Sequence, residues 1–158
     1  MACDVRVVSA RARLGFTFVG LGLHPGMGAT HLVASVAGYE VAYRLLLTGE
    51  VISGAEAHRL RLATVLAEDG PVAVERAVAM AERMAAQAPL AVRAAVRSLR
   101  QRQDEGLEAA LRREADAQSQ NFASADFAEG VAAAAARRPP RFAEYEGYRG
   151  LAEPRPKL

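Results

Sequence analysis

This sequence has little of several residue types that mark other protein classes. Cys3 is its only cysteine, Lys157 its only lysine, and tryptophan is absent. A single cysteine excludes an intrachain disulfide, and we expect Cys3 to be a small buried hydrophobic residue. The formal net charge is only +2, and no basic or aromatic stripe is evident. These features argue against a nucleic-acid partner or a membrane-surface partner.

Long apolar runs are also missing. No stretch approaches the roughly 20 apolar residues that a membrane-spanning helix needs, and no signal-peptide pattern opens the chain. The single cysteine fits a cytoplasmic location, which we expect. The composition is that of a globular protein, with 51% apolar and 24% charged residues in 158. A chain of this size is one domain or a large part of one, and it can bury a sizeable core.

The first 70 residues mix strand and helix signals. Polar and β-branched residues alternate at the start, and Ser53 with Glu56 has the spacing of a capping box. We predict strands over 4–9 and 63–66, an extended piece over 13–19, and helices over 31–37, 39–47 and 53–60.

From Val72 onward the pattern is almost wholly helical. Apolar residues at 74, 78, 81 and 85 indicate an amphipathic helix, proline is tolerated in a first helical turn, and Ser124 is a good N-cap. We predict helices over 72–88, from Pro89 to before Gly106, from there to about Gln120, and over 124–136. Prolines after Arg137 predict an irregular tail.

Strands followed by helices indicate a fragment of an α/β layer with an α-helical end. The few predicted strands cannot form an independent sheet of normal size, so at least one sheet face should be left uncovered. This argument from the residues predicts a chain that is incomplete or that needs partners.

Several motifs occur in a characteristic order. They are Ala2-Cys-Asp-Val-Arg6, Leu21-Gly-Leu-His-Pro-Gly-Met-Gly-Ala-Thr30, Leu47-Thr-Gly49 and Asp126-Phe-Ala-Glu-Gly-Val131. The set resembles the crotonase superfamily, the enoyl-CoA hydratase/isomerase group. The resemblance implies an α/β fold: a partial crotonase (ClpP/crotonase-like) spiral core over 1–71, a helical trimerisation-type region over 72–142 and an irregular tail over 143–158. Family members carry a long segment ahead of Ala-Cys-Asp, so we expect the C-terminal part of such a protein, lacking the N-terminal half.

The resemblance also implies a chemistry. The family acts on acyl-CoA thioesters, with coenzyme A as part of the substrate and no separate cofactor or metal. Two backbone N–H groups stabilise the thioester oxygen, and in hydratases two glutamates handle protons and water. Both N–H groups and one glutamate belong to segments ahead of Ala2. The second glutamate's place, four residues before Gly22, is taken by Phe18, which cannot transfer a proton.

The turn is what remains of the site, and its substrate-binding candidates are His24, Pro25, Gly26 and Gly28. In hydratases the glycine aligned with Gly26 lies beside the catalytic water, which its N–H can hold. His24 is the only titratable group in the turn and can act near neutral pH. The alternative is a loop histidine hydrogen-bonded to backbone.

Contacts to coenzyme A are sparse in this sequence. Arg137, Arg138 and Arg141 are candidates for binding its phosphates; the alternative is a solvated basic helix end favoured by the helix dipole. The family's late phenylalanine, which approaches a neighbouring subunit's ligand, corresponds to Ala134, and a late lysine corresponds to Ala143. The resemblance implies a homo-oligomer, either a trimer or a dimer of trimers.

Two functions remain open. The first is an enoyl-CoA hydratase/isomerase family enzyme of fatty-acid type metabolism, which needs the N-terminal half and is inactive as this chain alone. The second is a catalytically inactive truncated paralogue, or an oligomerisation or interaction module.

Overall fold

The computed structural model describes residues 1–142, except for the side chain of Arg102. The tail predicted over 143–158 lies outside the described residues. The elements in order are β1 (Val7–Ser9), β2 (Arg13–Gly15), the 3-10 turn η1 (Val19–Leu21), α1 (Ala29–Ala37), α2 (Tyr39–Thr48), β3 (Val51–Ser53), α3 (Gly54–Arg59), β4 (Val65–Ala67), α4 (Gly70–Ala85), α5 (Pro89–Gln103), α6 (Leu107–Phe122) and α7 (Ala125–Ala135).

Every predicted helix is present, with small shifts at the ends. The Ser53 and Ser124 side chains accept hydrogen bonds from the N–H groups of Glu56 and Phe127, as N-caps do. The three strand predictions are each partly wrong. β1 covers only the second half of 4–9, residues beyond Gly15 turn into η1 instead of staying extended, and β4 begins two residues later than the predicted 63–66. The short strand β3 was not predicted.

The strands form two small ladders. β1 pairs in parallel with β4, with Val7 opposite Val65, and β2 pairs antiparallel with β3, with Leu14 opposite Ile52. Each strand has three residues, and the part of the chain that the structure describes contains no complete multi-turn β-spiral. The fold therefore holds only a fragment of a sheet layer.

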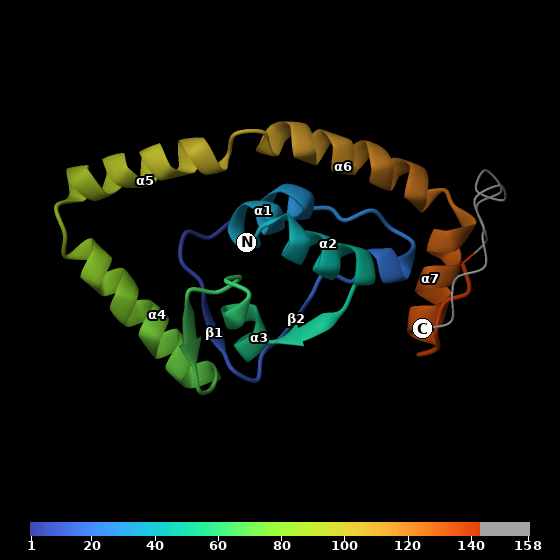
Figure 1. Ribbon diagram of the computed structural model, residues 1–158, viewed down its shortest axis with the longest axis horizontal. Coiled ribbons are helices and arrows are strands. Elements are labelled where there is room, and N and C mark those ends of the chain that lie inside the picture. The colour runs from blue at the N-terminus through green and yellow to red at the C-terminus, as the bar shows by residue number, and fades with distance from the viewer. Residues whose placement is uncertain (143–158) are drawn as a thin grey trace.

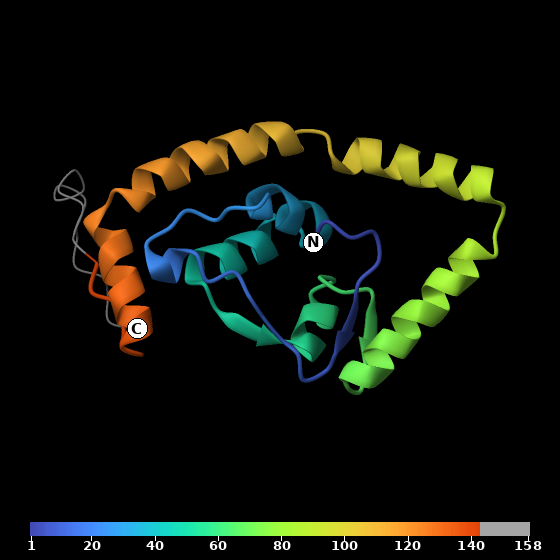
Figure 2. The same cartoon turned by 180° about the vertical axis from the view of Figure 1, so that it is seen from behind.

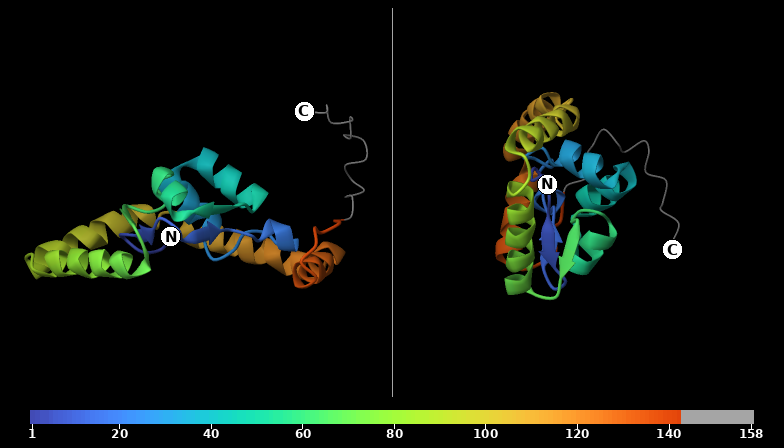
Figure 3. Two further views of the ribbon diagram at one scale, coloured as in Figure 1. Left: turned by 90° about the horizontal axis from the view of Figure 1, so that it is seen from below. Right: turned by 90° about the vertical axis from the view of Figure 1, so that its left-hand side faces the viewer.

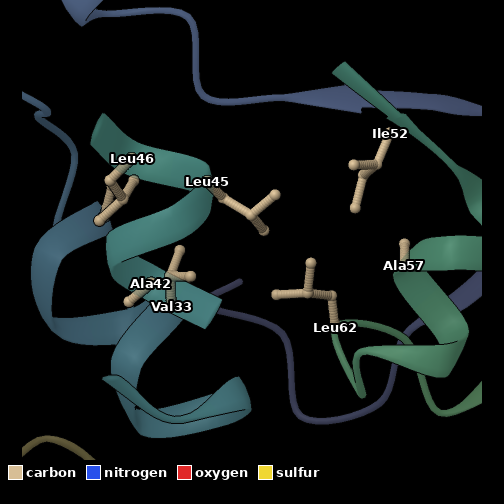
Figure 4. Packing of buried hydrophobic residues seen from close by; sticks show 8 residues of the cluster. Val33, Ala42, Leu45, Leu46, Ile52, Ala57 and Leu62 are labelled. Atoms are coloured by element: carbon tan, nitrogen blue, oxygen red, sulfur yellow. The ribbon is translucent and has the colours of Figure 1, made fainter. Parts of the chain in front are cut away.

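The core lies between the β2–β3 ladder and helices α1 to α3 (Figure 4). Leu45, Leu62 and Val33 are fully buried and come from α2, the segment after α3, and α1. Burying a side chain of this size contributes roughly 1.5–3 kcal/mol. This small core fixes α1 and α2 relative to the strands.

Helices α4 to α7 follow one another around the outside of this core (Figures 1 and 2). Seen from below, they form a layer with the core standing on one side of it (Figure 3). α4 packs on β1 and β4, α6 packs on α1, and α7 packs on η1. None of the described side chains of α5 is buried. Contacts near its C-terminal end tie it to the core, where Arg100 pairs with Asp4 and the Gln103 carbonyl bonds the His31 ring.

The apolar stripe of α4 is not covered by residues 1–142. Val74 and Val78 are 65% and 51% exposed, and Ala81 and Ala85 are exposed as well. The amphipathic helix predicted from this spacing is present, but no residue among 1–142 covers most of its apolar side.

Cys3 is exposed, so the prediction that it is buried is wrong. The N-terminal segment runs along the surface, and the Arg6 guanidinium binds the Cys3 carbonyl at 2.6 Å. Among the helices of residues 1–142, none is both long enough and apolar enough to cross a bilayer.

Candidate active-site turn

The turn between η1 and α1 begins and ends with glycines in the left-handed conformation. Gly22 has φ 70° and closes η1, and Gly28 has φ 73° and precedes α1. A Cβ atom on Gly22 would lie 2.6 Å from the Asp126 carbonyl oxygen. Position 22 therefore needs glycine both for its φ angle and for the close approach of α7.

Helix α6 holds the C-terminal end of this turn through one buried carboxylate. Glu114 Oε2 accepts the Gly28 N–H at 2.7 Å, and Oε1 accepts the Thr30 N–H at 2.9 Å and the Thr30 hydroxyl at 2.5 Å. The N-terminus of α1 has no cap from its own Gly28. Glu114 therefore supplies, from a distant helix, the acceptor that a local cap normally provides.

Two amides of α6 hold the N-terminal end of the turn. Asn121 Oδ1 accepts the His24 N–H at 2.7 Å, and Gln118 Nε2 donates to the His24 carbonyl at 2.9 Å. Glu114, Gln118 and Asn121 are spaced four and three residues apart, which places them on one face of the helix. We call these three residues the α6 clamp. Nothing in the sequence distinguishes them, because polar residues occupy many positions of α6 and do not reveal which of them face the turn.

Helix α7 approaches the turn through backbone. A Cβ atom on Gly130 would lie 2.5 Å from the carbonyl carbon of Leu21, so α7 and η1 touch directly at this point. Gly22 and Gly130 thus form the two sides of one contact, and both belong to motifs that the sequence analysis identified.

Gly26 lies between the two ends of the α6 clamp. It is buried, as is Pro25, and its N–H has no acceptor among residues 1–142. A Cβ atom there would collide with the Gln118 amide. Buried backbone N–H groups nearly always have a partner, so we expect a water molecule or a ligand to supply the missing acceptor.

The His24 ring bonds backbone. Its Nδ1 lies 2.7 Å from the Pro25 carbonyl oxygen, so Nδ1 carries the proton and the Nε2 of a neutral ring is an acceptor. This geometry matches the backbone-bonded alternative stated for His24. Phe18 is half-buried against the hydrophobic core and provides no proton-transfer group.

A cavity of about 500 Å³ adjoins the turn on the side of α2. Its walls are mainly apolar, and His24, Thr30 and Asn121 add polar groups. The remaining lining residues are Val19, Gly22, Leu23, Pro25, Tyr39, Ala42, Tyr43, Leu46 and Leu47. Tyr39, Tyr43 and Leu47 are exposed, so the cavity opens to the surface. No pattern in the sequence predicts this cavity.

The three candidate arginines lie after α7 and do not line this cavity. Arg138 binds both Glu129 oxygens, at 2.6 and 2.9 Å, and the Arg141 N–H donates to the same carboxylate at 2.7 Å. The Arg138 guanidinium, with the Arg141 N–H, lowers the pKa of Glu129 to about 2. Arg138 is therefore engaged by an acidic partner already, whereas no hydrogen bond of the Arg137 side chain is found within residues 1–142.

Comparison with known proteins places this fold among the crotonases. An enoyl-CoA hydratase/isomerase from Pseudoalteromonas atlantica T6c superimposes with a TM-score of 0.82 at 33% identity, covering 89% of this chain and 56% of that one. An enoyl-CoA hydratase from Mycobacterium avium subsp. paratuberculosis K-10 gives 0.80 at 32% identity, covering 90% and 58%. The structure is thus a partial crotonase fold, as the resemblance implied.

The sequence agrees with the fold. The profile of the enoyl-CoA hydratase/isomerase family matches residues 1–145, and the chain belongs to this family. It is 34% identical to 2,3-dehydroadipyl-CoA hydratase of Escherichia coli over 143 residues, which cover 90% of this chain and 55% of that protein. It is 34% identical to human enoyl-CoA hydratase domain-containing protein 2, mitochondrial, with 90% and 50% covered. The chain spans about half the length of the curated relatives it matches.

Proposed function

We propose that these residues form the C-terminal part of an acyl-CoA site that isomerises or hydrates an enoyl thioester. The observation that carries this proposal is the buried, acceptor-free Gly26 N–H on a turn held from both ends by α6. A fixed N–H at this place can orient a water molecule or polarise a bound oxygen. The acyl-CoA substrate, with coenzyme A as part of it and no further cofactor, belongs to the proposal, as do a cytoplasmic location and a role in fatty-acid metabolism.

Phe18 favours isomerisation over hydration within this proposal. Hydration in the family uses two glutamates, whereas moving one proton between two carbons of the acyl chain needs a single base. That base and both thioester N–H donors would come from the family's N-terminal half. Removing one such donor typically lowers kcat by about 10²–10³, so we expect these 158 residues alone to be inactive.

The test combines the purified chain with the N-terminal half of a family hydratase. We expect no turnover by either part alone, and isomerisation of a 3-enoyl-CoA that exceeds crotonyl-CoA hydration when both are present. Gly26→Pro removes this N–H, and Gly26→Ala is its matched control, because both variants place a Cβ atom against the Gln118 amide and only the alanine keeps the N–H. Hydration by the chain alone at the rate of an intact hydratase would contradict the proposal, and so would full activity of Gly26→Pro.

Coenzyme A recognition by the arginines after α7 is part of the same proposal. Arg137 and Arg141 are better phosphate candidates than Arg138, whose guanidinium already pairs with Glu129. In the combined sample, Arg137→Gln should raise KM for the acyl-CoA and leave kcat nearly unchanged, since a phosphate contact far from the reacting carbons binds ground state and transition state equally.

A second function, an oligomerisation or interaction module, is favoured by exposed apolar side chains. Tyr39, Tyr43 and Leu47 on α2 and Val74 and Val78 on α4 are all more than half exposed. Apolar surface of this kind favours association, so we propose a homo-oligomer, with a trimer as the defined state. Light scattering measures the oligomeric state directly. A species near the monomer mass of 16.8 kDa that persists at high concentration would contradict it.

A further inference from the structure

Glu114 is the one buried charged side chain among the residues that the structure describes, at 2% exposure. No cation pairs with it there. Burying a carboxylate without a cationic partner is unfavourable unless hydrogen bonds replace its hydration. Three donors meet this need, and the positive end of the α1 dipole adds to them.

All three donors lie just after Gly26. Glu114 holds Gly28 and Thr30, while Asn121 and Gln118 hold His24, two residues before Gly26. The peptide that carries the free N–H is therefore bracketed at both ends by one face of α6. Capping of α1 needs only the Glu114 contacts, whereas the Gln118 and Asn121 contacts fix the other end of the same turn.

We propose that Glu114 is a positioning residue for the Gly26 N–H, and that the site is formed only when α6 is docked against the turn. This inference rests on the proposed acyl-CoA function, because that function gives the Gly26 N–H its role. Glu114 itself touches no substrate; it acts through the turn.

The test compares Glu114→Gln with Glu108→Gln in the full chain. Glu108 is on the same helix but exposed, and it pairs only with Arg112 one turn away. Hydrogen exchange and ¹⁵N–¹H spectra report each amide separately. In Glu114→Gln we expect exchange at Gly28 and Thr30 to accelerate about 10- to 100-fold, since charge-assisted hydrogen bonds are lost, and the Gly26 resonance to move. In Glu108→Gln all these signals should stay unchanged.

The amides of Leu45 and Leu46 in the core are the internal reference. If their exchange accelerates as much as that of Gly28, the variant has lost global stability and the positioning role is refuted. If exchange at Gly28 accelerates while the Gly26 resonance stays in place, Glu114 is a helix cap only, which also refutes it. If Glu114→Gln does not fold, Asn121→Ala tests the docking of α6 from the other end of the turn. The Gly26 resonance should then move, and an unmoved resonance would refute the proposal.

Failure of the proposed function has a different signature. Adding crotonyl-CoA to the wild-type chain together with a hydratase N-terminal half should shift the Gly26 resonance. An unchanged resonance would count against the acyl-CoA site. The exchange comparison would still decide whether Glu114 positions the turn.

Discussion

The contact between Gly130 of α7 and Leu21 of η1 allows a sharp stability prediction. Replacing a glycine with alanine inside a helix ordinarily stabilises the helix by about 1 kcal/mol. At Gly130 the added Cβ would lie 2.5 Å from the Leu21 carbonyl carbon and 2.6 Å from its oxygen. Both atoms belong to the backbone and cannot rotate away, so α7 must shift as a unit.

Overpacking of this kind costs about 1–3 kcal/mol. The sum of the two effects predicts that Gly130→Ala loses about 1 kcal/mol of unfolding free energy, within a range of roughly 0–2 kcal/mol. Gly20→Ala is the matched control. Its Cβ would meet nothing within 4 Å, so the same chemical change one residue before Leu21 should stabilise the protein by about 0.4–1 kcal/mol through the unfolded chain.

Urea unfolding followed by circular dichroism measures both variants, with an unchanged m-value as the check on two-state behaviour. The opposite signs are the decisive feature. If Gly130→Ala were as stabilising as Gly20→Ala, α7 would not be in backbone contact with η1, and the described packing of the turn would be wrong.

Three further outcomes follow from the same structure. Leu45→Ala should lose about 2–5 kcal/mol of unfolding free energy because it leaves a cavity. Leu47→Ala, on the exposed side of α2, should change the unfolding free energy by less than about 0.5 kcal/mol. Urea titration compares the two variants. The Arg59 and Arg44 guanidinium groups lower the pKa of Glu56 from 4.5 to about 2, so these ion pairs stabilise the fold fully above pH 4.5 and are lost as the pH falls towards 2. Glu56→Gln should flatten the acid side of the stability curve in that window, and added salt should reduce the difference. Cys3 is exposed, so a disulfide reagent should titrate one thiol per native chain without denaturant; a thiol that reacts only after unfolding would show that the N-terminal segment is covered.

The helices were predictable because their signals are local. Pro89 begins α5, and Ser124 caps α7, since a cap or a first-turn proline acts within a few residues of itself. Strands need partners from elsewhere in the chain. β3 pairs with a segment some 40 positions earlier in sequence, which explains why Val51–Ser53 gave no clear signal and why residues 16–19 were wrongly read as extended.

Burial was harder to predict than secondary structure. The apolar spacing of α4 is real, yet Val74 and Val78 lie exposed, because burial depends on what packs opposite a helix and not on the helix itself. The prediction for Cys3 fails in the same way, because Cys3 is exposed as well. Its residue type favours burial, but a surface path of the N-terminal segment decides its environment.

The candidate site was half predictable. The ordered motifs identified Gly22, Gly26 and Gly130, since glycines required by a close backbone approach leave a fixed pattern in the sequence. Glu114 left no such pattern, because a polar residue in a helix is ordinarily solvated and nothing local indicates that it faces a turn 84 residues away. The free N–H of Gly26 became evident only from the full set of hydrogen bonds around it.

The long reach of the α6 clamp also fixes when the turn can form during synthesis. Gly28 and His24 are separated from their α6 partners by 86 and 97 residues. A ribosome adds about 5–20 residues per second, so the turn waits roughly 5–20 s after its own translation before its partners exist. During that interval α1 begins without its cap, and the aromatic face of α2 is already outside the ribosome. The uncapped start of α1 and the exposed aromatic face of α2 are therefore open to solvent for the whole of that interval, and slower elongation lengthens it.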